Sequence, residues 1–117
     1  MRCELILAGV IFSLFSPLAG TIPTEIGELV HLKQLDLGYN NLTGSIPVQL
    51  GKLTQLQVLY LRENELAGSL PTGILTNLTE LRYLFLQRNF LTGGVPTEGG
   101  LLKELNQLHM HENLLDE

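Results

Sequence analysis

The stretch LDLGYNNLTGSIP, residues 35–47, decides the fold because nearly the same order of residues comes back along the chain. Residues 59–71 read LYLRENELAGSLP, residues 84–96 read LFLQRNFLTGGVP, and residues 108–115, LHMHENLL, begin another copy. The four copies share an asparagine at one position: Asn40, Asn64, Asn89 and Asn113. A regular period of this length is typical of a solenoid, in which each unit buries its apolar side only against its neighbours.

The order of residues within one copy predicts a strand, a corner and an irregular return. Leu35 and Leu37 lie two positions apart, so in an extended strand both point to one side and Asp36 points to the other. The amide of the following asparagine can satisfy backbone groups that the corner leaves unpaired. Glycine and proline then punctuate the return limb, which favours 3₁₀ or short helical turns over a long α-helix.

The repeated pattern, L-x-x-L-x-L-x-x-N-x-L-x-G-x-I-P, closely resembles the plant-type, 24-residue class of leucine-rich repeats over about residues 18–117. The resemblance implies an α/β solenoid: a short right-handed coil with parallel strands on its concave face and 3₁₀ turns, short helical turns and loops on its convex face. The chain is similar to a fragment of the ectodomain of a leucine-rich-repeat receptor-like protein or kinase. The predicted units are a half repeat and four further units: 18–31, 32–55, 56–80, 81–104 and the partial repeat 105–117.

Residues 1–17 precede the repeats and carry an apolar run from Leu5 to about Phe15. The run has the length of a signal-peptide core and is shorter than the roughly 20 residues of a membrane span. Glu4 and Pro17 do not suit a signal peptide, so a hydrophobic helix covering the end of the solenoid is the alternative. No strand in phase with the repeats is expected before Leu18.

Composition limits the function classes. The chain has 117 residues, of which 44% are hydrophobic and 16% charged, as in a single globular domain. A net charge of −5 without a Lys/Arg run argues against nucleic acid as a partner. The single cysteine, Cys3, excludes an internal disulfide framework and a cysteine-based zinc cluster.

Residues that point away from the core fall side by side on stacked strands and form the candidate ligand surface. The candidate binding residues are Asp36, Tyr60, Arg62, Tyr83, Phe85, Gln87, Arg88, His109 and His111. Rigid aromatic side chains beside arginine are typical of binding hot spots, although outward strand positions also favour Tyr and Phe for their β-propensity alone. In leucine-rich-repeat proteins the concave face is the usual ligand surface, so the resemblance implies a protein or peptide ligand there.

The sequence gives little support for a metal site or for catalysis. His109 and His111 share a face, but a metal site needs three or four converging ligands, and the neighbouring strand offers Phe85 and Gln87. Neither Ser45 nor Ser69 has a His or carboxylate placed to activate it. We therefore predict no metal, no cofactor and no catalytic residue.

Two sequons, at Asn41 and Asn77, fit the N-x-[ST] pattern and favour the secretory route together with the apolar N-terminus. Three interpretations stay open. The preferred one is a secreted or cell-surface recognition module for a protein or peptide, with a co-receptor as a further candidate partner. The second is a cytoplasmic scaffold for signalling partners, without glycans. The third is a truncated structural fragment that has no ligand of its own.

Overall fold

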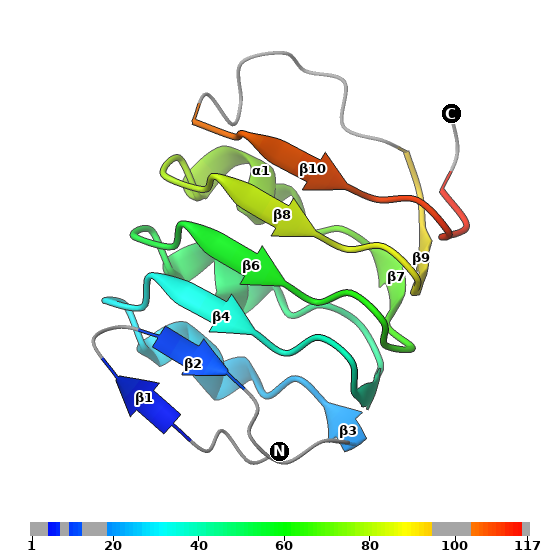
Figure 1. Ribbon diagram of the computed structural model, residues 1–117, viewed down its shortest axis with the longest axis horizontal. Coiled ribbons are helices and arrows are strands. Elements are labelled where there is room, and N and C mark those ends of the chain that lie inside the picture. Colours follow the sequence, from blue (N-terminus) through cyan, green and yellow to red (C-terminus); the bar gives the residue numbers. More distant parts are fainter. Residues whose placement is uncertain (1–4, 8–9, 13–18, 95–103, 116–117) are drawn as a thin grey trace.

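The computed structural model describes residues 5–7, 10–12, 19–94 and 104–115. It is a short solenoid in which parallel strands stack on one side and helical turns lie behind them (Figure 1). The main sheet has six strands in the order β1-β2-β4-β6-β8-β10. Their bounds are β1 Leu5–Leu7, β2 Val10–Phe12, β4 Gln34–Asp36, β6 Val58–Tyr60, β8 Tyr83–Phe85 and β10 Gln107–His109.

The register of the sheet follows the repeat. Leu35 pairs with Leu59, Leu59 with Leu84, and Leu84 with Leu108, each pair in parallel strands. Equivalent residues of successive repeats are therefore direct neighbours. This confirms the solenoid that the period predicts, because chain segments 24 or 25 residues apart pair at the spacing of neighbouring strands.

The flank of the solenoid carries two smaller parallel sheets. They form where the chain leaves the corner of each repeat. β3 (Ala19–Thr21) pairs with β5 (Asn41–Thr43), and β7 (Ala67–Ser69) pairs with β9 (Phe90–Thr92). The glycine after the corner has a positive φ, as at Gly44 (77°) and Gly68 (79°). A side chain at Gly44 would also meet the Thr21 methyl at 2.9 Å, so glycine is required there for both reasons.

The return limbs are short, as predicted. In the described residues they form two 3₁₀ helices, η1 (Thr24–Glu28) and η2 (Val48–Lys52), and one α-helix of six residues, α1 (Thr72–Asn77). Each begins directly after a proline, whose fixed φ suits the first turn. Each also buries one aliphatic side chain against the core: Ile26, Leu50 and Ile74.

The strand leucines form the core. Leu35, Leu37, Leu59 and Leu61 are completely buried, and so is Leu42 after the corner. Three asparagines lie among them: Asn40, Asn64 and Asn89 are 6%, 7% and 5% exposed. Buried amides are stable only when their hydrogen-bonding groups are satisfied.

Asn64 and Asn89 meet that requirement by bonding to the backbone of two repeats. The Asn64 side-chain NH₂ donates to the carbonyls of Leu37 (2.9 Å) and Leu61 (3.1 Å), and its Oδ1 accepts from the Leu42 N–H at 3.0 Å. Asn89 repeats the arrangement one turn later, with Oδ1 accepting from the Leu66 N–H at 3.0 Å. Asn64 and Asn89 therefore each fasten their own corner to the corner before it.

The N-terminal segment differs from the expectation. A helical cap is wrong for the described residues 5–7 and 10–12, which form β1 and β2, an antiparallel pair. The expectation that no strand in phase precedes Leu18 is also wrong, since β2 pairs in parallel with β4 and places Ile11 opposite Leu35. A continuous apolar run carries neither a period of 2 nor one of 3.6, so the sequence alone does not separate strand from helix there. Pairing with β4 satisfies backbone groups that an open sheet edge leaves free.

Replacing Asn64 with alanine tests the ladder. The change leaves the Leu42 N–H without its buried acceptor and takes one of two amide donors from the Leu37 carbonyl, which keeps the bond from Asn40, so we expect a loss of about 1–3 kcal/mol in the free energy of unfolding. Urea denaturation followed by circular dichroism measures it. Asn41→Ala is the matched control, because Asn41 is exposed and its loss should change stability by less than about 0.5 kcal/mol. Equal effects of the two substitutions would contradict the role assigned to the ladder.

Candidate functional site: the strand face

We use the term strand face for the side chains that point outward from β4, β6, β8 and β10 and from the two or three residues after each strand. Because the strands are in register, Asp36, Tyr60, Phe85 and His109 lie in one row across the sheet. The next outward position forms a second row, and the position before each ladder asparagine forms a third. Figure 1 shows this face turned toward the viewer, with the helical turns behind.

An aromatic column occupies the first row. The rings of Tyr60 and Phe85 are stacked, with centroids 4.5 Å apart and planes inclined by 19°. Phe85 and His109 stack in the same way, at 4.2 Å and 11°. The ring distances match the strand spacing, so the backbone holds the column in place. Stacking covers the ring faces within the column, which therefore offers ring edges to solvent.

Arg62 lies in the second row and leans over aromatic rings. Its guanidinium carbon is 4.6 Å from the Tyr60 ring centroid, 4.9 Å from that of Tyr39 and 5.7 Å from that of Phe85. Gly38 makes room for it, since a Cβ there would come within 3.3 Å of Arg62 Cγ. Among the described residues Nη1 is buried without a hydrogen-bond partner, so the cation is held by aromatic rings.

Arg88 lies in the third row between two carboxylates. Its Nη1 is 2.7 Å from Glu63 Oε1, and its Nε is 2.8 Å from Glu112 Oε2. The hydrogen bond with Glu63, followed by that with Glu112, raises the pKa of Arg88 above its ordinary value. Two acidic neighbours compensate this exposed cation, which makes it a weaker anchor for a ligand anion than Arg62.

The third row has an unusual backbone. Tyr39, Glu63, Arg88 and Glu112 all have a left-handed conformation, with φ between 57° and 59°. Residues other than glycine and asparagine seldom adopt it. In this conformation the side chain of each residue projects outward immediately before the ladder asparagine turns the chain inward.

The remaining predicted residues lie on the same face with separate contacts. Asp36 Oδ1 accepts a hydrogen bond from the Gly38 N–H at 3.0 Å. Gln87 is half-buried, and its Oε1 has no hydrogen-bond partner among the described residues. Tyr83 is half-buried on β8, two positions before Phe85, and is not a member of the column. His111 is exposed, with its ring centroid 6.1 Å from that of His109.

The nine predicted residues lie on one face, together with three residues that the sequence aligns with Arg88 but that the list of binding candidates leaves out. Tyr39 contacts Arg62, while Glu63 and Glu112 pair with Arg88. Their common signal is the position directly before the ladder asparagine. That position reads Tyr, Glu, Arg, Glu along the chain, an alternation of charge across three neighbouring repeats.

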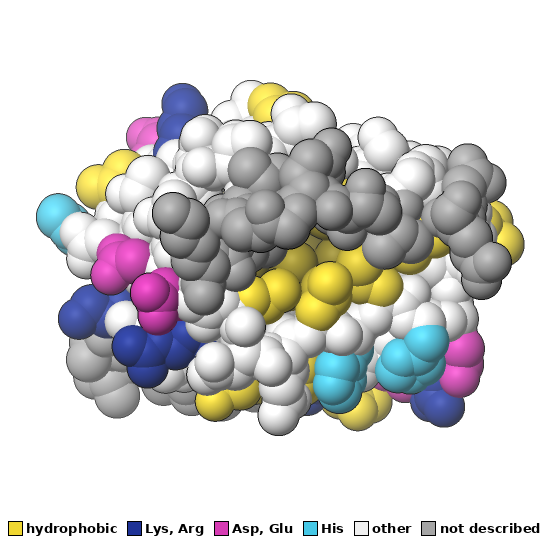
Figure 2. Space-filling view, turned by 90° about the horizontal axis from the view of Figure 1, so that it is seen from above, with side chains coloured by type: hydrophobic (Ala, Val, Ile, Leu, Met, Phe, Trp, Pro, Cys, Tyr) yellow, Lys and Arg dark blue, Asp and Glu magenta, His cyan; other side chains and the backbone are white. Residues whose placement is uncertain are grey.

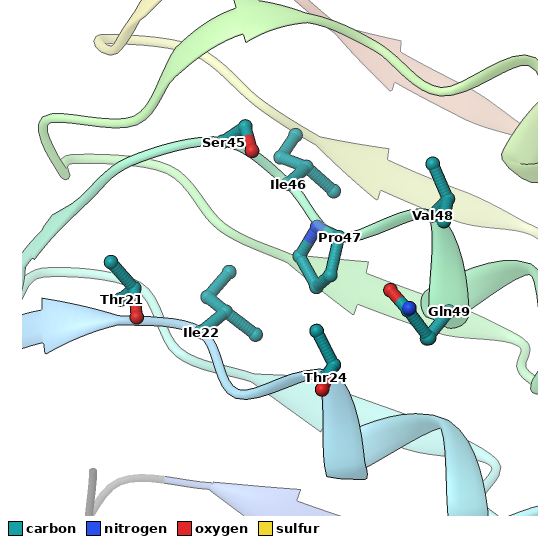
Figure 3. A pocket seen from close by; sticks show the side chains of 8 residues that line it. All are labelled: Thr21, Ile22, Thr24, Ser45, Ile46, Pro47, Val48 and Gln49. Carbon is teal, nitrogen blue, oxygen red and sulfur yellow. The ribbon is translucent and has the colours of Figure 1, made fainter.

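Other parts of the described chain offer no comparable chemistry. A shallow hollow of about 420 Å³ lies on the flank between two repeats, lined by residues 21, 22, 24 and 45–49 (Figure 3). Its lining is aliphatic, hydroxyl and amide, with no ionisable side chain. Within the described ranges no group of three or more His, Cys, Asp and Glu residues is placed to hold a metal ion. None of the helices in those ranges has the length and hydropathy to cross a membrane.

Both sequons lie on the surface. Asn41 is exposed as the first residue of β5, and Asn77 is exposed as the last residue of α1. Asn77 Oδ1 accepts a hydrogen bond from the Thr76 hydroxyl at 3.2 Å. Neither asparagine is on the strand face, so a glycan at either would leave the aromatic column uncovered.

The chain can be compared with protein families and with solved structures. Residues 21–66 match the family model described as leucine rich repeat. A search of curated proteins gives no match. Among solved structures, the chain is similar to the LRR ectodomain of the plant membrane receptor kinase GASSHO1/SCHENGEN3 from Arabidopsis thaliana, solved in complex with CASPARIAN STRIP INTEGRITY FACTOR 2. The TM-score is 0.85 and the identity 40%, over 91% of this chain and 13% of that one.

Two further structures from Arabidopsis are similar. One is a chain of the BIR3–SERK2 complex, with a TM-score of 0.82 and 36% identity over 98% of this chain and 63% of that one. The other is the receptor kinase HAESA in complex with the peptide hormone IDA and the co-receptor SERK1. There the TM-score is 0.77 and the identity 36%, over 83% of this chain and 16% of that one. This chain thus spans less than two thirds of each of these proteins.

Phe85→Ala tests the column. Removing the middle ring leaves Tyr60 and His109 without their shared stacking partner, so the upfield ring-current shift of the His109 ring protons in NMR spectra should disappear. The two lost aromatic contacts should lower stability by about 1–3 kcal/mol. Phe90→Ala is the control, since Phe90 is exposed on the flank. His109 proton shifts unchanged by Phe85→Ala would rule out the stack.

Proposed function

Because this chain is a leucine-rich-repeat protein with the fold of plant receptor-kinase ectodomains, we propose that it is a non-catalytic module that binds an extended peptide or a protein segment on its strand face. The observation that carries the proposal is the pairing of the aromatic column with Arg62. The column supplies a rigid apolar surface, and Arg62 supplies a half-buried cation held beside it.

The geometry of the rings favours a peptide over ligands that bind by stacking. Sugars and nucleobases are gripped by exposed aromatic faces, whereas the facing surfaces of Tyr60, Phe85 and His109 are covered by one another. Ring edges form an apolar ridge across three strands. Aliphatic or aromatic side chains of a peptide can pack along such a ridge while its polar groups meet Arg62 and Gln87.

Preorganisation supports the same proposal. Binding costs free energy whenever a flexible side chain must be ordered, at about 0.5–1.5 kcal/mol for a long one. Tyr60, Phe85 and His109 already constrain one another, and the rings around Arg62 restrict it before a ligand arrives. Arg88 is likewise held by Glu63 and Glu112.

The related structures give the ligand class and the partner class by analogy. The HAESA structure contains a peptide hormone and a co-receptor, and the GASSHO1/SCHENGEN3 ectodomain is bound to CASPARIAN STRIP INTEGRITY FACTOR 2. We extend this to the present chain as a proposal: its ligand is a peptide or protein, and a co-receptor is a candidate second partner. We also propose an extracellular location, which is supported by the similarity to the ectodomain of the membrane receptor kinase GASSHO1/SCHENGEN3.

A peptide-display selection against the immobilised chain tests the binding proposal. Linear peptides selected on the native protein should lose affinity by at least about tenfold, or about 1.4 kcal/mol, on the Tyr60→Ala/Phe85→Ala variant, because the ridge is removed. Val48→Ala is the control, as Val48 is exposed on the flank hollow. Circular dichroism verifies that each variant is folded. Peptides that keep full affinity for the folded double variant but lose it on Val48→Ala would move the site to the flank.

Intact mass and peptide mapping of the protein, produced in plant cells with its own N-terminus, test the location. For secretion we expect the leader within residues 1–17 to be absent and sugar to be attached at Asn41 or Asn77. Asn41→Gln and Asn77→Gln, made separately, identify the site, since the substitution of a glycosylated asparagine should remove one glycan mass. A protein that keeps Met1 and carries no sugar would favour the cytoplasmic scaffold, with β1 and β2 retained as the cover of β4.

A further inference from the structure

Asn41 and the flank hollow lie on the same outward surface. Asn41 and Thr43 are exposed on β5 while Leu42 between them is buried, so both side chains point out from the flank. Thr43 lies opposite Thr21 of β3, and Thr21 lines the hollow. Residues two positions apart on a strand are separated by about 7 Å and neighbouring strands by about 4.8 Å, which puts the Cα atoms of Asn41 and Thr21 roughly 8 Å apart.

The flank strands present small, uncharged side chains. Residues 19–21, 43–45 and 67–69 read AGT, TGS and AGS, and all of them are exposed. Figure 2, which views the molecule from the β10 end, shows most of the charged side chains of that view at the left, opposite the side on which β7 and β9 lie in Figure 1. Glu65, at the position equivalent to Asn41, belongs to the next repeat and lies on the other side of Asn41 from Thr21. No charged side chain of the described residues therefore separates Asn41 from the hollow.

The hollow offers neutral hydrogen-bonding groups over an aliphatic floor (Figure 3). The hydroxyls of Thr21 and Ser45 and the amide of Gln49 have no hydrogen-bond partner among the described residues. Ile22 and Ile46, which are 4% and 2% exposed, form the floor. Hydroxyl and amide groups both donate and accept, so the lining suits a neutral ligand with hydroxyl or amide groups and C–H surface. A charged ligand would lose its water there without gaining a counter-charge.

We propose that Asn41 carries an N-linked glycan whose first sugar units lie along β5 and β3 and dock in the flank hollow. The inference rests on the proposed extracellular location, because such a glycan is added in the secretory route. An N-linked glycan begins with N-acetylglucosamine, a neutral unit that has hydroxyl groups, an acetamide group and apolar C–H surface. These groups match the hydroxyls, the amide and the aliphatic floor of the hollow.

Covalent attachment makes this occupant more suitable than a free sugar. The hollow of about 420 Å³ is shallow and supplies few polar contacts, so its affinity for a sugar in solution is expected to be low. A group tethered nearby has an effective concentration on the order of millimolar. Weak contacts are then enough to keep the attached sugar docked.

The second sequon has different surroundings. The Asn77 Nδ2, the atom to which a sugar would be attached, packs against the neighbouring helical turns, since a Cβ at Gly51 would lie 3.4 Å from it and one at Gly73 3.5 Å. A glycan at Asn77 would have to displace this contact. The Asn41 side chain makes no hydrogen bond with the described residues, so a glycan there displaces nothing. Asn77 therefore provides the matched control for Asn41.

Hydrogen exchange followed by mass spectrometry tests the docking on the protein secreted from plant cells. Removal of the glycan by Asn41→Gln should speed the exchange of backbone amides in residues 45–49 at least about threefold, because the sugar no longer covers them. Asn77→Gln is the control and should leave the exchange of these amides unchanged. In protein made in bacteria, which carries no such glycan, Asn41→Gln should also leave it unchanged.

A double-mutant cycle tests the contact with Gln49. When the glycan is present, Gln49→Ala should raise the unfolding equilibrium constant at least about fivefold more than it does in the Asn41→Gln protein, because a sugar hydrogen bond is lost only when the sugar is there. Urea denaturation measures the constants. Gln34→Ala is the control, since Gln34 is exposed on β4, and its effect should be the same with and without the glycan.

The outcomes separate this inference from the proposed location. A glycan on Asn41 whose removal changes neither the exchange of residues 45–49 nor the effect of Gln49→Ala would overturn the docking and leave the location intact. A bare Asn41 in a chain that has lost its leader or carries sugar at Asn77 would do the same. A chain that keeps Met1 and carries no sugar would overturn both. The peptide proposed for the strand face is tested independently, by the display selection.

Discussion

The corner that follows each strand is the constraint on which the rest of the solenoid depends. Successive strands pair directly, so every 24 or 25 residues the chain must return to within one strand spacing of its start. The turn inward leaves backbone groups of two repeats pointing into the core. A buried asparagine satisfies them, as Asn64 does for Leu37, Leu42 and Leu61. Without that amide, the burial of leucines on both sides would be offset by unpaired polar groups.

Because the ladder satisfies the backbone of the corner from within, the outward side chains are not needed to pair those buried groups. This separation explains how much of the molecule the sequence predicts. Leu35, Leu59 and Leu84 are recognisable as core from spacing alone, and the glycine and proline positions mark the corner and the return limb. The same register brings Tyr60, Phe85 and His109 together, because residues at equivalent positions must become neighbours once the strands pair.

The features that the sequence does not predict depend on side-chain rotamers and on which of several neighbours a residue contacts. Arg62 leans across Gly38 toward Tyr39, one repeat earlier, and period alone does not reveal the direction of that lean. Arg88 binds Glu63 and Glu112 at once because a left-handed backbone aims all three side chains alike. At the N-terminus, an apolar run without alternation fits a helix or a strand equally well. The strand is favoured because β2 can pair with the edge of β4, and that edge forms only when the chain folds.

The left-handed residues show how stability and recognition are coupled in each repeat. Holding a non-glycine residue there costs about 1 kcal/mol or more, a cost that glycine would avoid. The structure offsets it through the backbone: the N–H groups of Tyr39, Glu63 and Arg88 donate to carbonyls of the next repeat at 3.0, 3.0 and 3.1 Å. The side chains are then free to face outward, where they order Arg62 or pair with one another. A glycine would relieve the strain but remove the groups that fix the cations of the strand face. The strained position is therefore retained where it organises the surface proposed to bind a ligand.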